Sequence, residues 1–334
     1  RPVGYDLITV GRVTMDLFAR DIGVPFESVT GFDTSVGGSP TNVAIASARL
    51  GLRSLAFTGV GDDLVGSYVE RYLRDEGVGT ERIATVPGKH TSLAMVAIQP
   101  PDRFPLTFYR DDPADIYLTV EDAERLPFDQ ATAMLISGNA FSRGSCVEAA
   151  RTCGLRARDA GLTVYMDLDL RPTEWARPRD YGRTLRSVLS LADVVIGTEE
   201  ECHAALAPDP DAVIAGGPIS AADHAALDDA LDALVGAGTV GTVVIKRGPR
   251  GATVIDASGR TDVPGFAAEA VNTVGAGDAF AAGLIRSRLA GWDWPDAARF
   301  ANACGSIQVT RHGCSAVFPT RAEVEAFIDQ QGGL

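Results

Sequence analysis

The sequence predicts an α/β protein with three layers, α/β/α, in which a mostly parallel central sheet lies between two layers of helices. Apolar, β-branched segments alternate with segments of helical periodicity along most of the 334 residues. The strand-like segments are apolar along their whole length, as strands are when both faces of a parallel sheet are covered. Two stretches that break this alternation predict a second, smaller sheet.

The alternation defines the main elements in chain order. Strands are predicted at residues 5–10, 55–60, 134–137, 163–167, 194–197 and 242–246. Helices are predicted at residues 40–50, 64–76, 145–160, 220–235 and 276–289. Since 46% of the residues are hydrophobic and no internal repeat divides the chain, we expect one large domain over residues 1–334.

The smaller sheet is predicted from residues 17–36 and 91–119, which are richer in glycine, proline and residues of alternating polarity. Residues 91–98 and 106–109 have the pattern of short antiparallel strands on either side of a Pro-Pro-Asp-Arg turn at residues 100–103. A sheet that projects beside a substrate cleft can act as a lid.

Charge and cysteine content exclude several classes of function. The formal net charge is −14 and no basic stripe is present, so nucleic acid is not an expected partner. No signal peptide is apparent, and no apolar run reaches the roughly 20 residues that span a bilayer. We therefore expect a cytoplasmic protein without a membrane partner. The five cysteines are irregularly spaced, which predicts reduced, buried thiols in place of disulfides or a zinc site.

A pair of glycines precedes the first predicted helix. Gly37 and Gly38 let the backbone approach a ligand closely. Ser39 is predicted to cap the helix, with Pro40 as its first residue. Asn42, in the first turn, offers a donor and an acceptor to a polyol hydroxyl. On this segment alone, a ligand site and an ordinary capped helix both remain open.

A second turn of small residues opens the helix predicted at residues 276–289. Gly275, Ala276 and Gly277 leave backbone N–H groups uncovered at a helix N-terminus, where the helix dipole also favours an anion. Such donors can stabilise a phosphoryl group as charge develops on it. Asp278, in the same turn, can accept the proton of an attacking hydroxyl, although an acid at this position can also serve only to complement the dipole.

Two common nucleotide-binding motifs are absent from the sequence. The chain has no Gly-x-x-x-x-Gly-Lys-Ser/Thr segment and therefore no Walker A loop. After the first strand, residues 11–16 (Gly-Arg-Val-Thr-Met-Asp) lack the second and third glycines of a dinucleotide-binding turn, which disfavours a hydride-transfer enzyme.

The two glycine-rich segments, in this order and near opposite ends of the chain, resemble the paired signatures of the ribokinase-like (phosphofructokinase-B-type) carbohydrate kinases. The resemblance covers essentially the whole chain. It implies a ribokinase-like fold with a small β-sheet lid, ATP as the phosphoryl donor, and Mg²⁺. It also implies that Asp278 deprotonates the accepting hydroxyl and that the turn at residues 275–277 forms an anion hole.

The same resemblance assigns binding residues. Those expected at the sugar are Asp16, Gly37, Gly38 and Asn42. Those expected at the nucleotide are Lys246, Gly248, Gly251 and Asn302; the first three also fit a β-hairpin turn, and Asn302 also fits a buried capping role. Glu200 is expected to organise Mg²⁺ through water, although Glu199 and Glu201 are its neighbours.

Three positions depart from the family pattern. The second signature begins with Asn272 in place of the usual aspartate, which leaves a monovalent-cation requirement open and weakens the case for potassium. Gly197 replaces the asparagine of an Asn-x-x-Glu motif that ends at Glu200. Asp169 stands where many relatives that act on sugar acids have asparagine.

Two arginines predict an anionic sugar. Arg110 lies on the expected lid and Arg171 follows a buried strand, and both resemble substrate-binding positions of sugar-acid kinases in this family. A guanidinium can bind a carboxylate through two parallel hydrogen bonds. The alternative is that both arginines form ion pairs with Asp111, Asp112 or Asp169.

Four further segments resemble the members of the family that phosphorylate a keto-deoxy sugar acid in myo-inositol catabolism: residues 31–33, 100–106, 167–171 and 196–201. We therefore expect an ATP-dependent kinase of such an acid, and a homodimer formed through the lid. A kinase of 2-keto-3-deoxygluconate, fructose or ribose remains an alternative, as does a non-catalytic sugar or nucleotide sensor.

Overall fold

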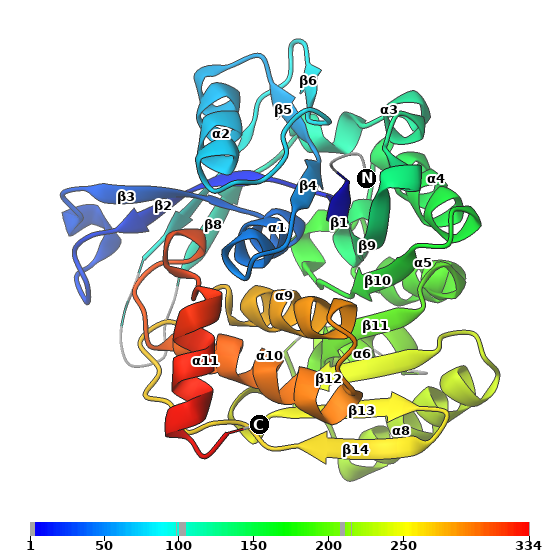
Figure 1. The fold of residues 1–334 in the computed structure, drawn as a ribbon. Helices are drawn as coiled ribbons and strands as arrows, with labels where there is room; N and C mark the ends of the chain where they lie inside the picture. The colour runs from blue at the N-terminus through cyan, green and yellow to red at the C-terminus, as the bar shows by residue number, and fades with distance from the viewer. Residues whose placement is uncertain (1–3, 98, 100–104, 208–210, 215, 334) are drawn as a thin grey trace.

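Two layers of helices cover a large β-sheet, and a smaller sheet projects to one side (Figure 1). The computed structural model describes residues 4–97, 99, 105–207, 211–214 and 216–333. The turn predicted at residues 100–103, and residue 98 of the adjoining predicted strand, lie outside the described residues.

The large sheet has eight strands in the order β14-β13-β12-β11-β10-β9-β1-β4. From β4 to β12 all neighbours pair in parallel, whereas β13 and β14 form an antiparallel edge. The strands are β1 (Tyr5–Val10), β4 (Ser54–Phe57), β9 (Ala131–Ser137), β10 (Thr163–Asp167), β11 (Val194–Thr198), β12 (Thr242–Lys246), β13 (Ala252–Asp256) and β14 (Gly259–Val263). The strand predicted at residues 55–60 divides into β4 and the short β5 (Gly59–Gly61), which pairs with β6 (Ala84–Val86).

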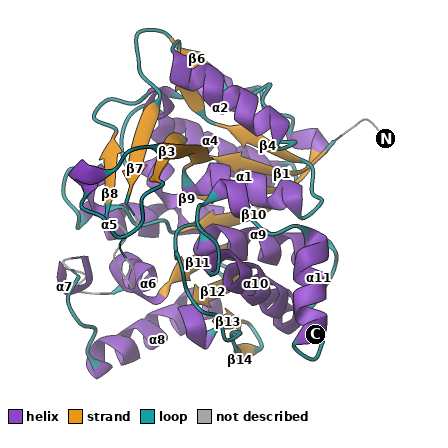
Figure 2. Ribbon diagram, turned by 90° about the vertical axis from the view of Figure 1, so that its left-hand side faces the viewer, coloured by secondary structure: helices purple, strands orange, loops and turns teal. Residues whose placement is uncertain are grey.

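The helices lie on both faces of the large sheet. Figure 2 shows α9, α10 and α11 on one side and α5, α6 and α8 on the other. The helices are α1 (Ser39–Arg49), α2 (Leu64–Asp75), α3 (Val120–Glu124), α4 (Cys146–Asp159), α5 (Asp180–Val188), α6 (Glu199–Leu206), α7 (Asp211–Ile214), α8 (Ala221–Gly236), α9 (Ala276–Leu289), α10 (Trp294–Val309) and α11 (Arg321–Gln330).

The core is divided into two apolar layers, one on each face of the large sheet. Successive residues of a strand alternate between them: Leu7 of β1 packs in one layer and Ile8 in the other, and Leu135 and Ile136 of β9 do the same. Both faces of the sheet are therefore shielded from solvent, which explains why these strands are apolar along their whole length.

The smaller sheet has four strands in the order β3-β2-β7-β8. They are β3 (Phe32–Gly37), β2 (Thr14–Ala19), β7 (Ser92–Val96) and β8 (Leu106–Tyr109), and β2 pairs in parallel with β7. The sheet thus begins at Thr14, three residues before the predicted stretch. Its two edges are β3 and β8.

No helix in the described part of the chain combines the length and the apolar character needed to cross a bilayer. The five cysteines are buried, as predicted, and none is in a disulfide.

Candidate active site

Asp278 lies where the N-termini of α1 and α9 meet. It is in the first turn of α9, and α1 packs against this helix. Its carboxylate accepts a hydrogen bond from Ser39 Oγ at 2.7 Å and another from Asn42 Nδ2 at 2.8 Å, both in the first turn of α1. The two glycine-rich segments from opposite ends of the chain therefore form one site.

The surroundings of Asp278 suit a group that accepts a proton. Burial raises the pKa of Asp278, while the hydrogen bonds from Ser39 and Asn42 act in the opposite direction by stabilising the ionised form. A carboxylate that is fixed in orientation and has a raised pKa is matched to general-base chemistry near neutral pH.

Ser39 has a different role from the predicted one. The helix α1 begins at Ser39 itself, and Gly38 occupies the N-cap position with a φ of +96°. The Ser39 hydroxyl makes no capping hydrogen bond and donates to Asp278 instead. The spacing of Ser39 and Asn42 in the sequence could have indicated that both side chains face the same ligand or acid, because residues three apart lie on the same face of a helix.

The residues expected at the sugar lie together between β2 and α1. A Cβ at Gly37 would lie 2.0 Å from the Asp16 carboxylate, and a Cβ at Gly38 would lie 2.5 Å from the carbonyl oxygen of Arg12, so both positions require glycine. Burial raises the pKa of Asp16 to about 7, against the opposing hydrogen bond from Thr14 Oγ1. The contact of these residues with a sugar stays a prediction.

The turn before α9 is also built on a required glycine. Gly275 caps the helix with a φ of +81°, and a Cβ there would lie 2.7 Å from Cys314 Sγ. The N–H groups in the first turn of a helix have no intrahelical acceptor. Ala276 and Gly277 line a cavity, and the Ala276 N–H already donates to the carbonyl oxygen of Thr273 at 3.3 Å. The predicted anion hole therefore depends on Gly277 and the residues that follow it in the first turn.

That cavity has a volume of about 1000 Å³, which is within the usual range of small-molecule sites. It is lined by every residue predicted to contact the nucleotide: Lys246, Gly248, Gly251 and Asn302.

The hairpin and the capping role raised for the nucleotide residues hold in the structure, and their contact with a nucleotide stays a prediction. Strands β12 and β13 are antiparallel neighbours that pair Lys246 with Ala252, so the segment between them is a hairpin as well as a cavity wall. Asn302 Nδ2 donates to the carbonyl oxygens of Val263 and Pro264 at 3.2 and 3.1 Å, so Asn302 also has the buried capping role.

The ammonium group of Lys246 extends to the N-terminus of α9. Its Nζ lies 3.1 Å from Asp167 Oδ2, and a Cβ at Gly277 would lie 3.2 Å from the same nitrogen. Burial lowers the pKa of Lys246, but the carboxylates of Asp167 and Glu201 outweigh it and hold the pKa above its ordinary value. The sequence predicted a nucleotide contact for Lys246 but not that a protonated amine lies beside the expected anion hole.

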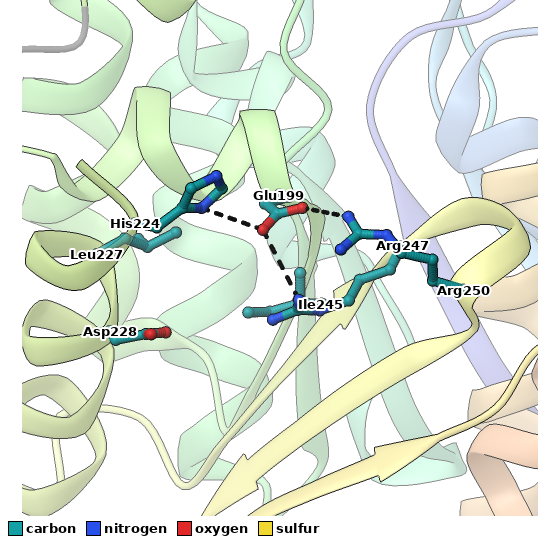
Figure 3. Close-up of a pocket in the computed structure, with 7 residues that line it drawn as sticks. All are labelled: Glu199, His224, Leu227, Asp228, Ile245, Arg247 and Arg250. Carbon is teal, nitrogen blue, oxygen red and sulfur yellow. Dashed lines mark hydrogen bonds and ion pairs between the residues drawn. The ribbon is translucent and has the colours of Figure 1, made fainter. Parts of the chain in front are cut away.

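The three glutamates that open α6 have different roles. Glu201 accepts hydrogen bonds from the backbone N–H groups of Thr198 and Leu170 and so caps the helix. Glu199 pairs with Arg250 at 2.7 Å and with His224 at 3.3 Å, beside a second cavity of about 260 Å³ (Figure 3).

Glu199 and Glu200 both line the large cavity, but only Glu200 is exposed there. Since Glu199 is held by Arg250 and His224, Glu200 is the glutamate better placed to face a bound metal. Within the described ranges, no group of three His, Cys, Asp or Glu side chains is arranged to bind a metal ion directly. A contact through water, as the sequence predicted, agrees with this arrangement, although the metal role of Glu200 stays a prediction.

The two arginines predicted to bind the carboxylate of the substrate differ in their surroundings. The ion-pair alternative applies to Arg171, which lies 3.3 Å from Asp169 and is partly exposed. Arg110 is buried and pairs with Asp115 at 2.7 Å and Glu174 at 3.1 Å, neither of which was among the expected partners. A direct contact with the substrate stays a prediction for both arginines.

Arg12, which the sequence analysis did not single out, belongs to the same charge cluster. It follows β1 directly, its Nη2 lies 3.2 Å from Asp169 Oδ1, and its guanidinium lies 5.7 Å from the centroid of the Phe108 ring. The sequence could have indicated Arg12 as a site residue, because it lies at the carboxyl end of a parallel strand, where open α/β sheets bind their ligands.

Asn272 stabilises the loop that leads into the anion hole. It is buried, its Nδ2 donates to the carbonyl oxygen of Gly313 at 2.9 Å, and its Oδ1 accepts from the backbone N–H of Val274 at 2.9 Å. An amide side chain thus joins two loops at this position. Whether the protein needs a monovalent cation stays open.

Comparison with known proteins identifies the family of this chain. Residues 5–321 match the pfkB family of carbohydrate kinases. Relatives named 5-dehydro-2-deoxygluconokinase, from Geobacillus kaustophilus (strain HTA426) and Shouchella clausii (strain KSM-K16), are 34% and 32% identical over 328 and 330 residues. These alignments cover 97% and 98% of this chain and 94% and 96% of the relatives. The chain therefore belongs to the pfkB family of carbohydrate kinases, which makes it a phosphotransferase.

Solved structures of similar proteins have the same fold. A putative ribokinase II from E. coli in its apo form matches with a TM-score of 0.82 at 25% identity, covering 98% of this chain and 99% of that chain. A complex of that protein with ATP and Mg²⁺ matches with a TM-score of 0.81 at 25% identity and the same coverage. A fructokinase from Xylella fastidiosa with bound ATP gives 0.80 at 26% identity, covering 97% and 98%. The predicted ribokinase-like fold is confirmed.

Proposed function

We propose that the protein transfers the γ-phosphoryl group of ATP to a terminal hydroxyl of a keto-deoxy sugar acid, with 5-dehydro-2-deoxygluconate as the substrate. The observation that carries the proposal is the position of Asp278, which Ser39 and Asn42 hold on one side and whose own helical turn lines the large cavity on the other. The choice of acid is supported by the names of the curated relatives and by the sequence at residues 167–171 and 196–201.

The arrangement accounts for the chemistry of an in-line transfer. Asp278 accepts the proton of the attacking hydroxyl, and Ser39 and Asn42 keep its carboxylate in one orientation. The first-turn N–H groups of α9 and the Lys246 ammonium offset the charge on the transferred group. In reactions of this kind, positioning and electrostatic stabilisation supply most of the acceleration.

The acidic wall of the cavity fits a magnesium ion held through water. The Glu200 carboxylate is exposed there, and oxygen ligands with several retained waters are what Mg²⁺ prefers. A bound Mg²⁺, held through water by Glu200, would neutralise part of the charge on the phosphates. The chain's own contribution is to place Glu200 on the cavity that Ala276 and Gly277 also line.

We place this activity in the cytoplasm, because the phosphoryl donor is ATP and the five cysteines are free thiols.

We further propose a homodimer formed through the smaller sheet. Its edge strand β8 exposes the side chains of Leu106 and Tyr109, 43% and 58% of whose surfaces are accessible. An exposed edge strand with apolar side chains is suited to pairing with a second copy.

A coupled ADP-release assay with MgATP tests the proposed function. The substrates are 5-dehydro-2-deoxygluconate, 2-keto-3-deoxygluconate, fructose, ribose and a nucleoside, and we expect the highest kcat/KM for the first. A higher value for a neutral sugar would keep the kinase chemistry and overturn the choice of a sugar acid. Absence of turnover with every substrate would favour a non-catalytic sensor.

A further inference from the structure

Arg12 is a buried guanidinium with unused hydrogen-bond donors. Its side chain is only 4% exposed. Nη2 is paired with Asp169, whereas Nε and Nη1 are buried without a partner among the described residues. Buried polar groups in native structures nearly always have a partner, because a buried donor without one loses its hydration and gains nothing in return, and the cost is greater when the donor is charged. The unused donors of Arg12 therefore call for a ligand atom or a water molecule.

Arg12 shares its one ion-pair partner with a second arginine. Asp169 Oδ1 lies 3.2 Å from Arg12 and 3.3 Å from Arg171, and Asp169 Oδ2 accepts from Ser137 Oγ at 2.8 Å. Other acids, among them Glu201, act on Arg171 from a longer distance. None of them pairs with Nε or Nη1 of Arg12, which stay without a hydrogen-bond partner among the described residues.

The neighbouring arginines, by contrast, are matched by acids. Arg110 and Arg143 share two carboxylates, Asp115 and Glu174, at 2.7 to 3.2 Å. Arg143 also donates to the backbone carbonyl oxygens of residues 110 and 111. The unused buried donors are therefore at Arg12, and not at Arg110.

The position of Arg12 is that of a ligand site. Arg12 and Asp169 follow β1 and β10 at the carboxyl edge of the large sheet, where open α/β sheets bind ligands. Asp169 has a φ of +39°, the only positive value for a non-glycine residue in the described part of the chain, and such strain concentrates at functional sites. Phe108 of β8 covers the Arg12 guanidinium from the smaller sheet.

We propose that Arg12, with Arg171 beside it on Asp169, binds the carboxylate of the sugar-acid substrate and so sets the preference for an acid over a neutral sugar. This inference rests on the proposed function. A carboxylate oxygen at Nη1 of Arg12 gives a buried, unpaired donor a charged acceptor. Because Nε and Nη1 are shielded from solvent, we expect the Phe108 ring to turn aside as the substrate enters.

The test compares 5-dehydro-2-deoxygluconate with its carboxamide, which keeps the shape and removes the charge. For Arg12→Gln we expect the KM for the acid to rise by roughly 10- to 100-fold, the range for a lost hydrogen bond to a charged group, while the KM for the amide changes little. Titration calorimetry of the acid in the absence of ATP should show the same loss of affinity. Equal changes for acid and amide, or no change, would overturn the role of Arg12.

Two further variants keep the test decisive. Arg143→Gln removes a nearby arginine whose charge is already matched, so it should leave the ratio of the two KM values unchanged. Arg12→Lys keeps the charge and replaces Arg12→Gln in the test if Arg12→Gln does not fold. It should still raise the KM for the acid more than the KM for the amide. If the wild-type protein itself phosphorylates only neutral sugars, the proposed function fails first and the inference fails with it.

Discussion

At the scale of single residues, burial gives the acids of the site their properties. The pKa values of Asp16 and Asp167 are raised to about 7 by burial, and that of Asp278 is raised for the same reason. Keeping carboxylates in a dry site costs stability at neutral pH, where they must either ionise without full solvation or hold a proton. The site is thus arranged for reaction at the expense of folding stability.

This cost leads to a prediction for Asp16→Asn. The folded protein holds a proton on Asp16 up to about pH 7, whereas the unfolded chain releases it near 3.8. Folding therefore takes up a proton between these values, and the free energy of unfolding falls as the pH rises through this window. We expect Asp16→Asn to raise that free energy at pH 8 by up to about 4 kcal/mol and to have no effect below pH 4. Urea unfolding of the ligand-free protein at several pH values measures this; a difference that is independent of pH would contradict it.

At the scale of single elements, α9 is bounded by two glycines in the left-handed conformation. Gly275 caps its N-terminus at a φ of +81°, and Gly291 follows its C-terminus at a φ of +83°. A Cβ at Gly275 would meet Cys314 and Phe318, whereas a Cβ at Gly291 would meet nothing within 4 Å. The two glycines therefore have similar backbone strain but different surroundings.

This pair gives a matched test of the anion hole. Gly291→Ala should lower the free energy of unfolding by about 1–2 kcal/mol, the cost of a left-handed non-glycine residue, and leave kcat unchanged. Gly275→Ala should carry the same cost and also displace the first turn of α9, so we expect kcat to fall at least about tenfold. Thermal unfolding and steady-state kinetics on both variants decide this. Equal kcat values for the two would show that the turn has no catalytic role.

The elements differ in how far the sequence could predict them. The bounds of β1, β10, β12 and α9 agree with the predicted ones, because strands shielded from water on both faces and turns of small residues have strong local patterns. The strand predicted at residues 55–60 divides in two, and β9 begins three residues before its predicted start. The edge strand β14 was missed, since four of its five residues are exposed and carry no such pattern. The cap at Gly38 was also missed, because Ser39 donates to a residue 239 positions away.

At the scale of the whole molecule, the site is formed by contacts that no local pattern could reveal. Lys246 at the end of β12 reaches Asp167 at the end of β10, past the strand β11 that lies between them, and Arg110 meets Asp115 and Glu174 on separate segments. The sequence therefore predicted which residue types gather at the carboxyl edge of the sheet but not which charges are already paired. That distinction moves the expected carboxylate contact from Arg110 toward Arg12.

The smaller sheet carries a prediction for assembly. If two copies pair through β8, Tyr109→Asp should shift the protein from dimer to monomer, because a charge replaces an apolar side chain in the interface. Leu155→Asp, at an equally exposed apolar position on α4, should leave the dimer intact. Light scattering coupled to size-exclusion chromatography measures the mass of each variant. A wild-type protein that is monomeric at all concentrations would contradict the proposed dimer.

The central claim is that Asp278 is the base of a kinase, and the most direct measurement is the turnover of Asp278→Asn with 5-dehydro-2-deoxygluconate and MgATP, together with its affinity for ATP. We expect kcat to fall on the order of 10²- to 10⁴-fold, the usual contribution of a general base, with the Kd for ATP nearly unchanged because the large cavity remains intact. Turnover close to that of the wild type would contradict the assignment of Asp278 and with it the mechanism.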